Sequence, residues 1–310
     1  MTVTRPAPPN ERTVGIAYST WHRTLPWRHV WGVPELGFYV SDDRRVIRRH
    51  AEWLTYAGVD FVWIDWSNNV FYIPGETQNR PDFDMIERSV DVMFEEYTQL
   101  RRAPKISIFI GCPDHPDAVR DGLLTRKADQ VWKQFGVDPH RKAMLQHYQG
   151  KPLLVVYVGT PSPFPAGVPE WTHPEFTVRW MTGFITQQPN LMGPDRVSRY
   201  GYWCWEDRGE QTYPIVAGVP EAMVVTACWR PEWNGSVATP GRRNGETFRQ
   251  QWARARKLGV RHAMVVSWNE WTLGEQSSPE VSKDIEPSRE HGRRYLEILR
   301  EQINLFKRGV

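Results

Sequence analysis

The hydrophobic and polar positions of this chain repeat in one order. A short apolar run is followed by a turn-rich stretch, and then by apolar residues at the spacing of an amphipathic helix. The apolar runs predict eight strands, at Val14 to Tyr18, Val59 to Ile64, Lys105 to Ile110, Leu153 to Val158, Val178 to Phe184, Gly201 to Trp205, Ala222 to Ala227 and His262 to Ser267.

Helical patterns fall between these runs. Asp42 and Asp43 are suited to cap a helix that continues to Ala57, and Gly58 is suited to end it. The other helices are expected at about Asp84 to Arg102, Asp117 to Phe135 with a further turn after Pro139, Gly245 to Leu258, and Ser288 to Lys307.

The alternation predicts an α/β fold, a single (β/α)₈ TIM-type barrel, because parallel strands need a crossover long enough to hold a helix. An open doubly wound sheet is the alternative, but the chain has no G-x-G-x-x-G turn after the first strand and no phosphate-binding loop motif. A length of 310 residues suits one barrel. We expect residues 1–12, with three prolines, to be a flexible tail and residues 13–310 to be the catalytic barrel.

The amino-acid composition limits the classes of partner that we expect. The chain is 40% hydrophobic and 24% charged, as folded globular proteins are, and its net charge of +3 is spread without a basic run. We expect neither nucleic acid nor membrane as a partner, no cofactor, and a monomer or weak homo-oligomer. Cys112, Cys204 and Cys228 have no metal-binding spacing and are expected to be reduced and buried. The absence of a secretory pattern at the start of the chain predicts a cytoplasmic location.

Three carboxylic residues follow predicted strands, where the reactive groups of a barrel enzyme lie. Asp65 follows the second strand, Glu206 the sixth and Glu270 the eighth, and each is flanked by tryptophan. Apolar walls raise a carboxyl pKa, and acetal hydrolysis needs one protonated and one ionised carboxyl group. The pattern therefore predicts a glycoside hydrolase that acts on an oligo- or polysaccharide.

Each carboxylate also has a structural interpretation. Asp65 could hold its own turn by accepting backbone hydrogen bonds, and Glu206 could form a surface ion pair with Arg208. Glu270 is different, because it follows a strand that reads as buried, where a carboxylate is costly to desolvate without a purpose.

The 16 tryptophans of the chain are the other unusual feature. Indole faces stack on the C–H faces of sugar rings, although core packing is the alternative for any single one. The predicted stacking surfaces are Trp21, Trp66, Trp205, Trp229 and Trp271. Asn68 and Asn269 are suited to recognise hydroxyl groups, since an amide offers both a donor and an acceptor.

The segment Val265–Trp271, which reads VVSWNEW, and the downstream Gly274–Gln276 and Asp284–Pro287 resemble the eighth-strand region of glycoside hydrolase family 99 and related 71-like enzymes. The segments Ala17–His22 and Gly58–Asn68 are also similar to theirs. These families contain endo-α-mannosidases and α-glucanases.

In family 99 the eighth-strand element reads Asn-Glu-Trp-x-Glu. The resemblance implies that Glu270 matches the first glutamate, which assists through the sugar 2-hydroxyl. The second glutamate, the acid/base, is replaced here by Leu273. The proton must then come from Glu275, from Glu206, whose tryptophan walls favour it slightly, or from Asp65.

Two other functions stay open. A carbohydrate-binding barrel without catalysis is one, because Leu273 replaces the second glutamate. A metal-dependent hydrolase or deacetylase could use His22 and His115 with acidic residues, although the chain has no H-E-x-x-H pair and we assign no metal site.

Overall fold

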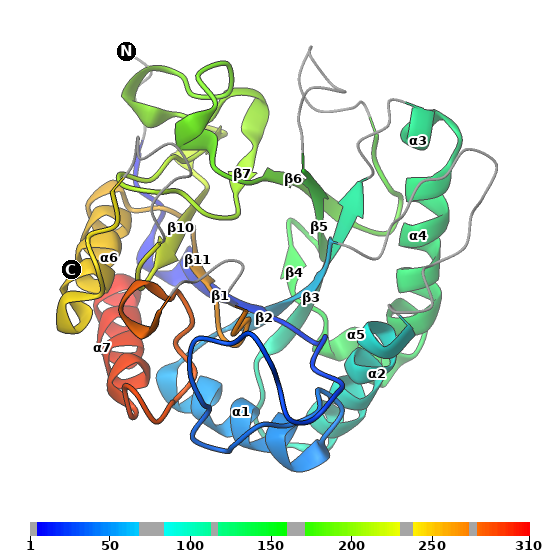
Figure 1. Ribbon diagram of the computed structural model, residues 1–310. Coiled ribbons are helices and arrows are strands. Elements are labelled where there is room, and N and C mark those ends of the chain that lie inside the picture. The colour runs from blue at the N-terminus through cyan, green and yellow to red at the C-terminus, as the bar shows by residue number, and fades with distance from the viewer. Residues whose placement is uncertain (1–4, 68–83, 113–116, 160–170, 230–237, 273–277) are drawn as a thin grey trace.

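The computed structural model describes residues 5–67, 84–112, 117–159, 171–229, 238–272 and 278–310. Parallel strands form a ring in chain order, with β10 and β7 at the two ends of the hydrogen-bonded path (Figure 1). The barrel strands are β1 (Thr13–Tyr18), β2 (Phe61–Trp66), β3 (Lys105–Cys112), β5 (Lys151–Val158), β6 (Thr177–Thr182), β7 (Trp203–Cys204), β10 (Ala222–Thr226) and β11 (His262–Val266). The predicted (β/α)₈ barrel is confirmed, and each strand overlaps one predicted run.

The helices lie outside the ring (Figure 1). They are α1 (Arg44–Ala57), α2 (Asp84–Gln99), α3 (Asp117–Arg120), α4 (Leu123–Val131), α5 (Pro139–Met144), α6 (Glu246–Leu258) and α7 (Arg294–Arg308). Helix α1 begins where the Asp43 side chain accepts the N–H of Arg45, and it ends at Gly58, whose φ of 86° suits glycine. A π-helical turn, Trp132–Gly136, continues α4.

Two connections differ from the repeating pattern. Between β6 and β7 the chain forms three short 3₁₀ turns, Ile185–Gln187, Pro194–Arg196 and Arg199–Gly201. Between β7 and β10 it forms a small hairpin, β8 (Ile215–Val216) and β9 (Val219–Pro220). A two-residue strand, β4 (His147–Tyr148), pairs antiparallel with β5.

The last helix begins at Arg294, so the prediction that it starts at Ser288 was wrong. Residues 288–292 form a turn instead, in which Ser288 and Gly292 exchange backbone hydrogen bonds of 3.2 and 2.7 Å. Gly292 has a φ of 56°, which glycine adopts without strain.

Residues 5–12, which belong to the stretch expected to be a flexible tail, are docked onto the barrel. Ala7 is 1% exposed, and its N–H bonds the carbonyl of Gly259. The Arg12 guanidinium donates to the carbonyls of Ala7 and Phe306. Residues 5–12 are therefore part of the folded domain.

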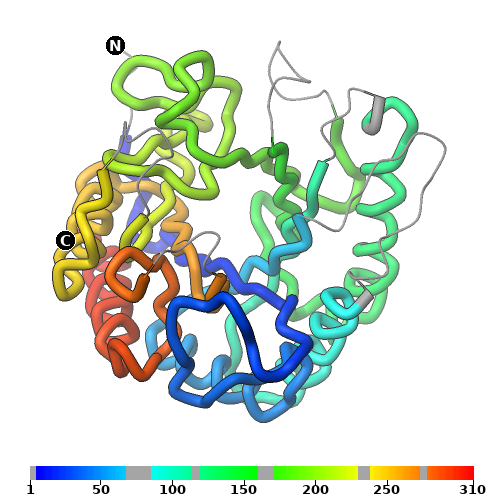
Figure 2. The backbone as a smooth tube through the Cα atoms, in the orientation of Figure 1, coloured from blue at the N-terminus to red at the C-terminus, as the bar shows by residue number. Residues whose placement is uncertain are grey.

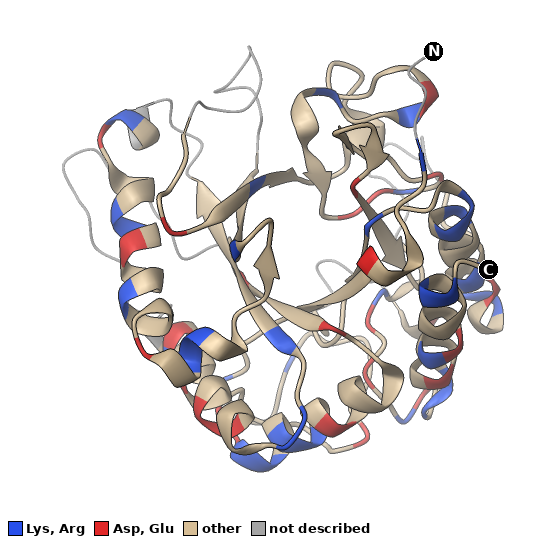
Figure 3. Ribbon diagram, turned by 180° about the vertical axis from the view of Figure 1, so that it is seen from behind, with Lys and Arg blue, Asp and Glu red and all other residues tan. Residues whose placement is uncertain are grey.

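The outer surface carries mixed charge. Acidic and basic residues alternate along the outer helices when the barrel is seen from behind (Figure 3). All three cysteines are buried and outside any disulfide, as the sequence predicted. Among the described helices, none is both long and apolar enough to cross a membrane.

Candidate active site

Two segments pass side by side over the carboxyl ends of the strands. They are the loop of residues 19–43 after β1, and residues 278–293 before α7 (Figure 2). Pro34 forms a β-bridge with Ser288, and the N–H of Glu35 bonds the carbonyl of Pro287 at 2.8 Å. These contacts hold residues 278–293 over the end of β11.

A pocket of about 190 Å³ opens at this end of the barrel. Its lining residues are Trp21, Asp65, Ser67, Phe109, Tyr157, Phe184, Trp205 and Glu270. The structure thus brings together two of the predicted catalytic carboxylates and two of the predicted stacking tryptophans, from β1, β2, β7 and β11.

Aromatic rings form one side of the pocket. Trp205 and Phe109 stack with ring centroids 5.3 Å apart and planes 7° from parallel. Trp63 packs edge-on against Trp205 at 5.2 Å, inside the barrel. The Trp205 ring is partly exposed in the pocket that Asp65 and Glu270 also line, and the Lys283 ammonium lies 5.8 Å from its centroid.

A buried lysine contacts Glu270. The Nζ atom of Lys283 is 2.8 Å from Glu270 Oε2 and 3.0 Å from Glu206 Oε2, and Lys283 is 1% exposed. Arg208 Nε is 3.6 Å from the other oxygen of Glu206. Glu206 is therefore a buried group between two cations, and its pair with Arg208 is not a surface one.

The backbone of Glu270 is held by Asp284. The Asp284 carboxylate accepts the backbone N–H of Glu270 at 2.8 Å and that of Trp271 at 2.7 Å. It also accepts the indole N–H of Trp31 at 2.8 Å. Trp271 has a φ of 63°, a conformation that residues other than glycine rarely adopt. These bonds stabilise the turn that directs Glu270 into the pocket.

Asp65 has a different environment. It is 6% exposed, and its Oδ1 accepts the N–H of Ser67 at 2.8 Å. Burial raises the pKa of Asp65, and this outweighs the Ser67 hydrogen bonds and the charge of Lys283, which lower it. Asp65 is thus the pocket carboxyl group whose surroundings favour the protonated form.

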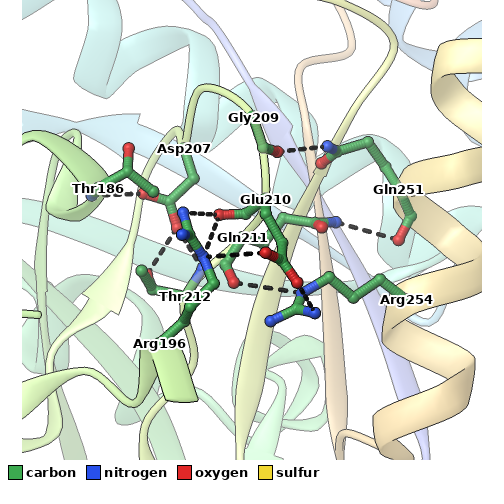
Figure 4. Close-up of polar contacts among 9 residues, drawn as sticks. All are labelled: Thr186, Arg196, Asp207, Gly209, Glu210, Gln211, Thr212, Gln251 and Arg254. Atoms are coloured by element: carbon green, nitrogen blue, oxygen red, sulfur yellow. Dashed lines mark hydrogen bonds and ion pairs between the residues drawn. The ribbon is translucent and has the colours of Figure 1, made fainter. Parts of the chain in front are cut away.

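The loop after β7 is fixed by its own side chains (Figure 4). Asp207 accepts the N–H of Thr186 at 3.1 Å and both the N–H and the hydroxyl of Thr212 at 2.6 Å. Gln251 on α6 donates to the carbonyl of Gly209 at 2.9 Å. Trp205 and Glu206 consequently precede a loop that hydrogen bonds hold to Thr186 and to α6.

Comparison with solved structures gives two strong likenesses. An endo-α-mannosidase of glycoside hydrolase family 99 from Bacteroides thetaiotaomicron, in complex with bis-tris-propane, matches with a TM-score of 0.66 and 17% identity over 96% of this chain and 98% of that one. A second structure of this enzyme gives 0.64 and 15% over the same shares. The chain has the family 99 fold. No protein-family model matches the chain, and no curated protein does.

Two of the predicted stacking surfaces are wrong. Trp66 and Trp271 are both completely buried. Trp66 lies on the outer face of β2, against Phe135 and under the ammonium of Lys127. Trp271 stacks on Trp31 at 4.5 Å and donates its indole N–H to Glu286 at 2.7 Å.

The prediction that Asn269 recognises a sugar hydroxyl is also wrong. Asn269 is fully buried, and its side chain bonds both the N–H and the C=O of Ser19, at 2.8 and 3.0 Å. It ties the β1 loop to the Asn269–Trp271 segment. Trp229 is 8% exposed, donates to the carbonyl of Ala238 and does not line the described pocket. Asn68, Leu273 and Glu275 lie outside the described residues.

His22 serves the fold in this structure. Its Nε2 bonds the carbonyl of Asn269 at 2.9 Å, its ring stacks on Trp27 at 4.0 Å, and burial lowers its pKa to about 4. Over the described ranges, no group of three or more His, Cys, Asp or Glu side chains is placed to hold a metal ion. His115 lies outside those ranges.

Sequence reasoning missed Lys283, as well as the pocket-lining Ser67, Phe109, Tyr157 and Phe184. Lys283 stands 13 residues beyond Glu270, in a segment with neither strand nor helix pattern. A signal was present in its neighbours, because Asp284–Pro287 belongs to the part of the chain that resembles family 99.

Proposed function

We propose that this protein is a glycoside hydrolase that cleaves an oligo- or polysaccharide in the pocket between Asp65 and Glu270. The observation that carries the proposal is the pairing of two unlike carboxyl groups in one small aromatic pocket. Glycosidic cleavage needs one carboxyl group to give a proton and another to act as an anion. The family 99 fold supports the same conclusion.

The two groups take different roles in this proposal. Asp65 is the acid, because it lines the pocket and burial raises its pKa. Glu270 is the anionic partner, because the Lys283 ammonium contacts its carboxylate. Glu206, which the sequence favoured as the acid, contacts Lys283 and Arg208 and does not line the described pocket.

The pocket suits one sugar ring at the bond that is cleaved. Its volume of about 190 Å³ lies below the several hundred Å³ of pockets that hold larger ligands. In this proposal Trp205 offers a flat face for the sugar ring, because it lines the same pocket as Asp65 and Glu270. Because the similar structures are described as endo-α-mannosidases, α-mannosides are the first substrates to test. The panel also includes other sugars and linkages, because Leu273 stands where family 99 has its second glutamate.

The experiment measures turnover of aryl α- and β-glycosides and of polysaccharides by the native enzyme and by Glu270→Gln. We expect the variant to fold normally and to lose at least about a hundredfold in rate, as enzymes that lose such a carboxylate do. Glu52→Gln is the matched control, since Glu52 is exposed and pairs only with Arg49 in the described contacts. Wild-type turnover by Glu270→Gln would contradict the proposal.

Two further arms of this experiment address the other functions. Saturable sugar binding without turnover of any substrate would favour the non-catalytic barrel. Loss of turnover on treatment with a chelator, with recovery on adding metal, would favour the metal-dependent hydrolase.

A further inference from the structure

Lys283 lies on a segment that fixes its position. The Ser282 hydroxyl donates to the carbonyl of Pro279 at 2.8 Å and accepts from Arg242 at 2.6 Å. On its other side, Asp284 bonds the backbone of Glu270, and the N–H of Ile285 bonds the carbonyl of Ser267 at 3.0 Å. The ammonium group is thus directed between β7 and β11.

A buried cation is costly unless anions compensate its charge. Lys283 is 1% exposed, and its ammonium contacts the carboxylates of Glu206 and Glu270. Its charge also acts on Asp65, whose pKa it lowers, although burial of Asp65 has the larger effect. The ammonium therefore acts on all three carboxyl groups.

We propose that Lys283 is a positioning residue that holds Glu270 ionised and oriented, with Glu206 as its second anchor, so that the proton of the site resides on Asp65. This inference rests on the proposed function for its catalytic meaning.

The charges around the pocket support this division. Two cations, Lys283 and Arg208, face the two carboxylates of Glu206 and Glu270. With Asp65 neutral, the two positive and two negative charges cancel. With Asp65 ionised, the buried site carries one excess negative charge. Arg208 is in turn fixed against the ring of Phe184, 4.4 Å from its centroid. Glu206 therefore serves as the second anchor for the lysine, and only Glu270 of this pair lines the pocket.

The first test titrates the carboxyl groups directly and needs no substrate. Protein labelled with ¹³C at the Asp and Glu carboxyls is followed by NMR against pH, and the signals are assigned from Glu206→Gln, Glu270→Gln and Asp65→Asn. In the native protein we expect Glu270 to titrate below Asp65. Asp65 titrating below Glu270 would overturn the proposal, even if no lysine variant folds.

The second test removes the charge. In Lys283→Met the Glu270 carboxyl group should titrate about 1–3 pH units higher, which is the usual effect of losing a contacting opposite charge. The midpoint of the acidic limb of the pH–rate profile should rise with it, and Lys283→Arg should restore most of both shifts. An unchanged midpoint for Glu270 would overturn the proposal.

The matched control is Lys127→Met. Lys127 is also a buried lysine, 4% exposed and paired with Glu87, but it lies on α4 outside the barrel. Its loss should lower stability and leave the pocket titrations unchanged. If the titrations behave as expected while the native protein cleaves no glycoside, the proposed function fails and the charge arrangement stands. If glycosides are cleaved and the titrations do not move, only the role of Lys283 fails.

Discussion

Replacing Trp271 by alanine should lower the unfolding free energy of the protein and should leave the pocket lining in place. The side chain is completely buried, and truncating such a residue costs about 3–5 kcal/mol of unfolding free energy. With an m-value of about 5 kcal/mol/M in guanidinium chloride, the unfolding midpoint should fall by roughly 0.6–1 M. Circular dichroism during denaturation measures this shift.

Trp271→Phe separates the packing of this residue from its hydrogen bond. Phenylalanine keeps most of the contact with Trp31 and removes the N–H donor to Glu286, a bond to a carboxylate that is worth about 1.5–3 kcal/mol. Tyr39 still donates to the same oxygen at 2.8 Å, so the lower end of that range is expected.

Trp171→Ala is the matched control for Trp271→Ala. Trp171 is partly exposed and lies outside the active-site pocket, and its loss should cost about 1 kcal/mol. An unchanged midpoint in Trp271→Ala, together with weaker sugar binding, would place this indole in the pocket and refute the reasoning.

The other predictions concern the pocket itself. Asp65→Asn should slow cleavage of natural substrates about a hundredfold or more and spare dinitrophenyl glycosides, whose leaving groups need little protonation; equal losses on both would exclude Asp65 as the acid. Because burial raises the pKa of Asp65 above its unfolded value of about 4, its contribution to native stability should fall as pH rises through the folded pKa, and Asp65→Asn should remove this dependence from the unfolding midpoint. Trp205→Ala should weaken substrate binding more than Trp171→Ala does, and calorimetry that shows equal affinities would argue against stacking on Trp205.

The sequence predicted the barrel strands because their apolar runs are buried and separated by turn residues. Strand β6 is a useful case, since Arg179 interrupts its apolar run. The structure compensates this charge with Glu221, whose carboxylate accepts from the guanidinium at 2.8 Å. The start of the last helix was misplaced because no local pattern marks residues 288–293 as a turn, and contacts with the β1 loop hold them there.

The site was predicted in part for a reason of geometry. Strand ends meet at one edge of a parallel barrel, so Asp65 and Glu270 were found together. Side chains alternate between the two faces of a strand, however, and a pocket-facing Asp65 requires that Trp66 face the helices. Applying that alternation would have removed Trp66 from the stacking residues.

Other assignments depended on contacts distant in sequence. Asn269 and Trp271 stand on either side of Glu270, yet both are buried in contacts with residues 19–43 and 284–286. Lys283 reaches Glu270 only because its segment folds back over β11. No spacing rule in a single sequence reports such contacts.

The most direct test of the account is a crystal structure of Glu270→Gln with a bound oligosaccharide. The account predicts one sugar ring on the face of Trp205, with the scissile oxygen within hydrogen-bond distance of Asp65 and the substituted side chain on the other side of the bond. A sugar chain bound elsewhere, for example in the surface pocket beside Trp171 and Trp180, with the space between Asp65 and residue 270 empty, would contradict it.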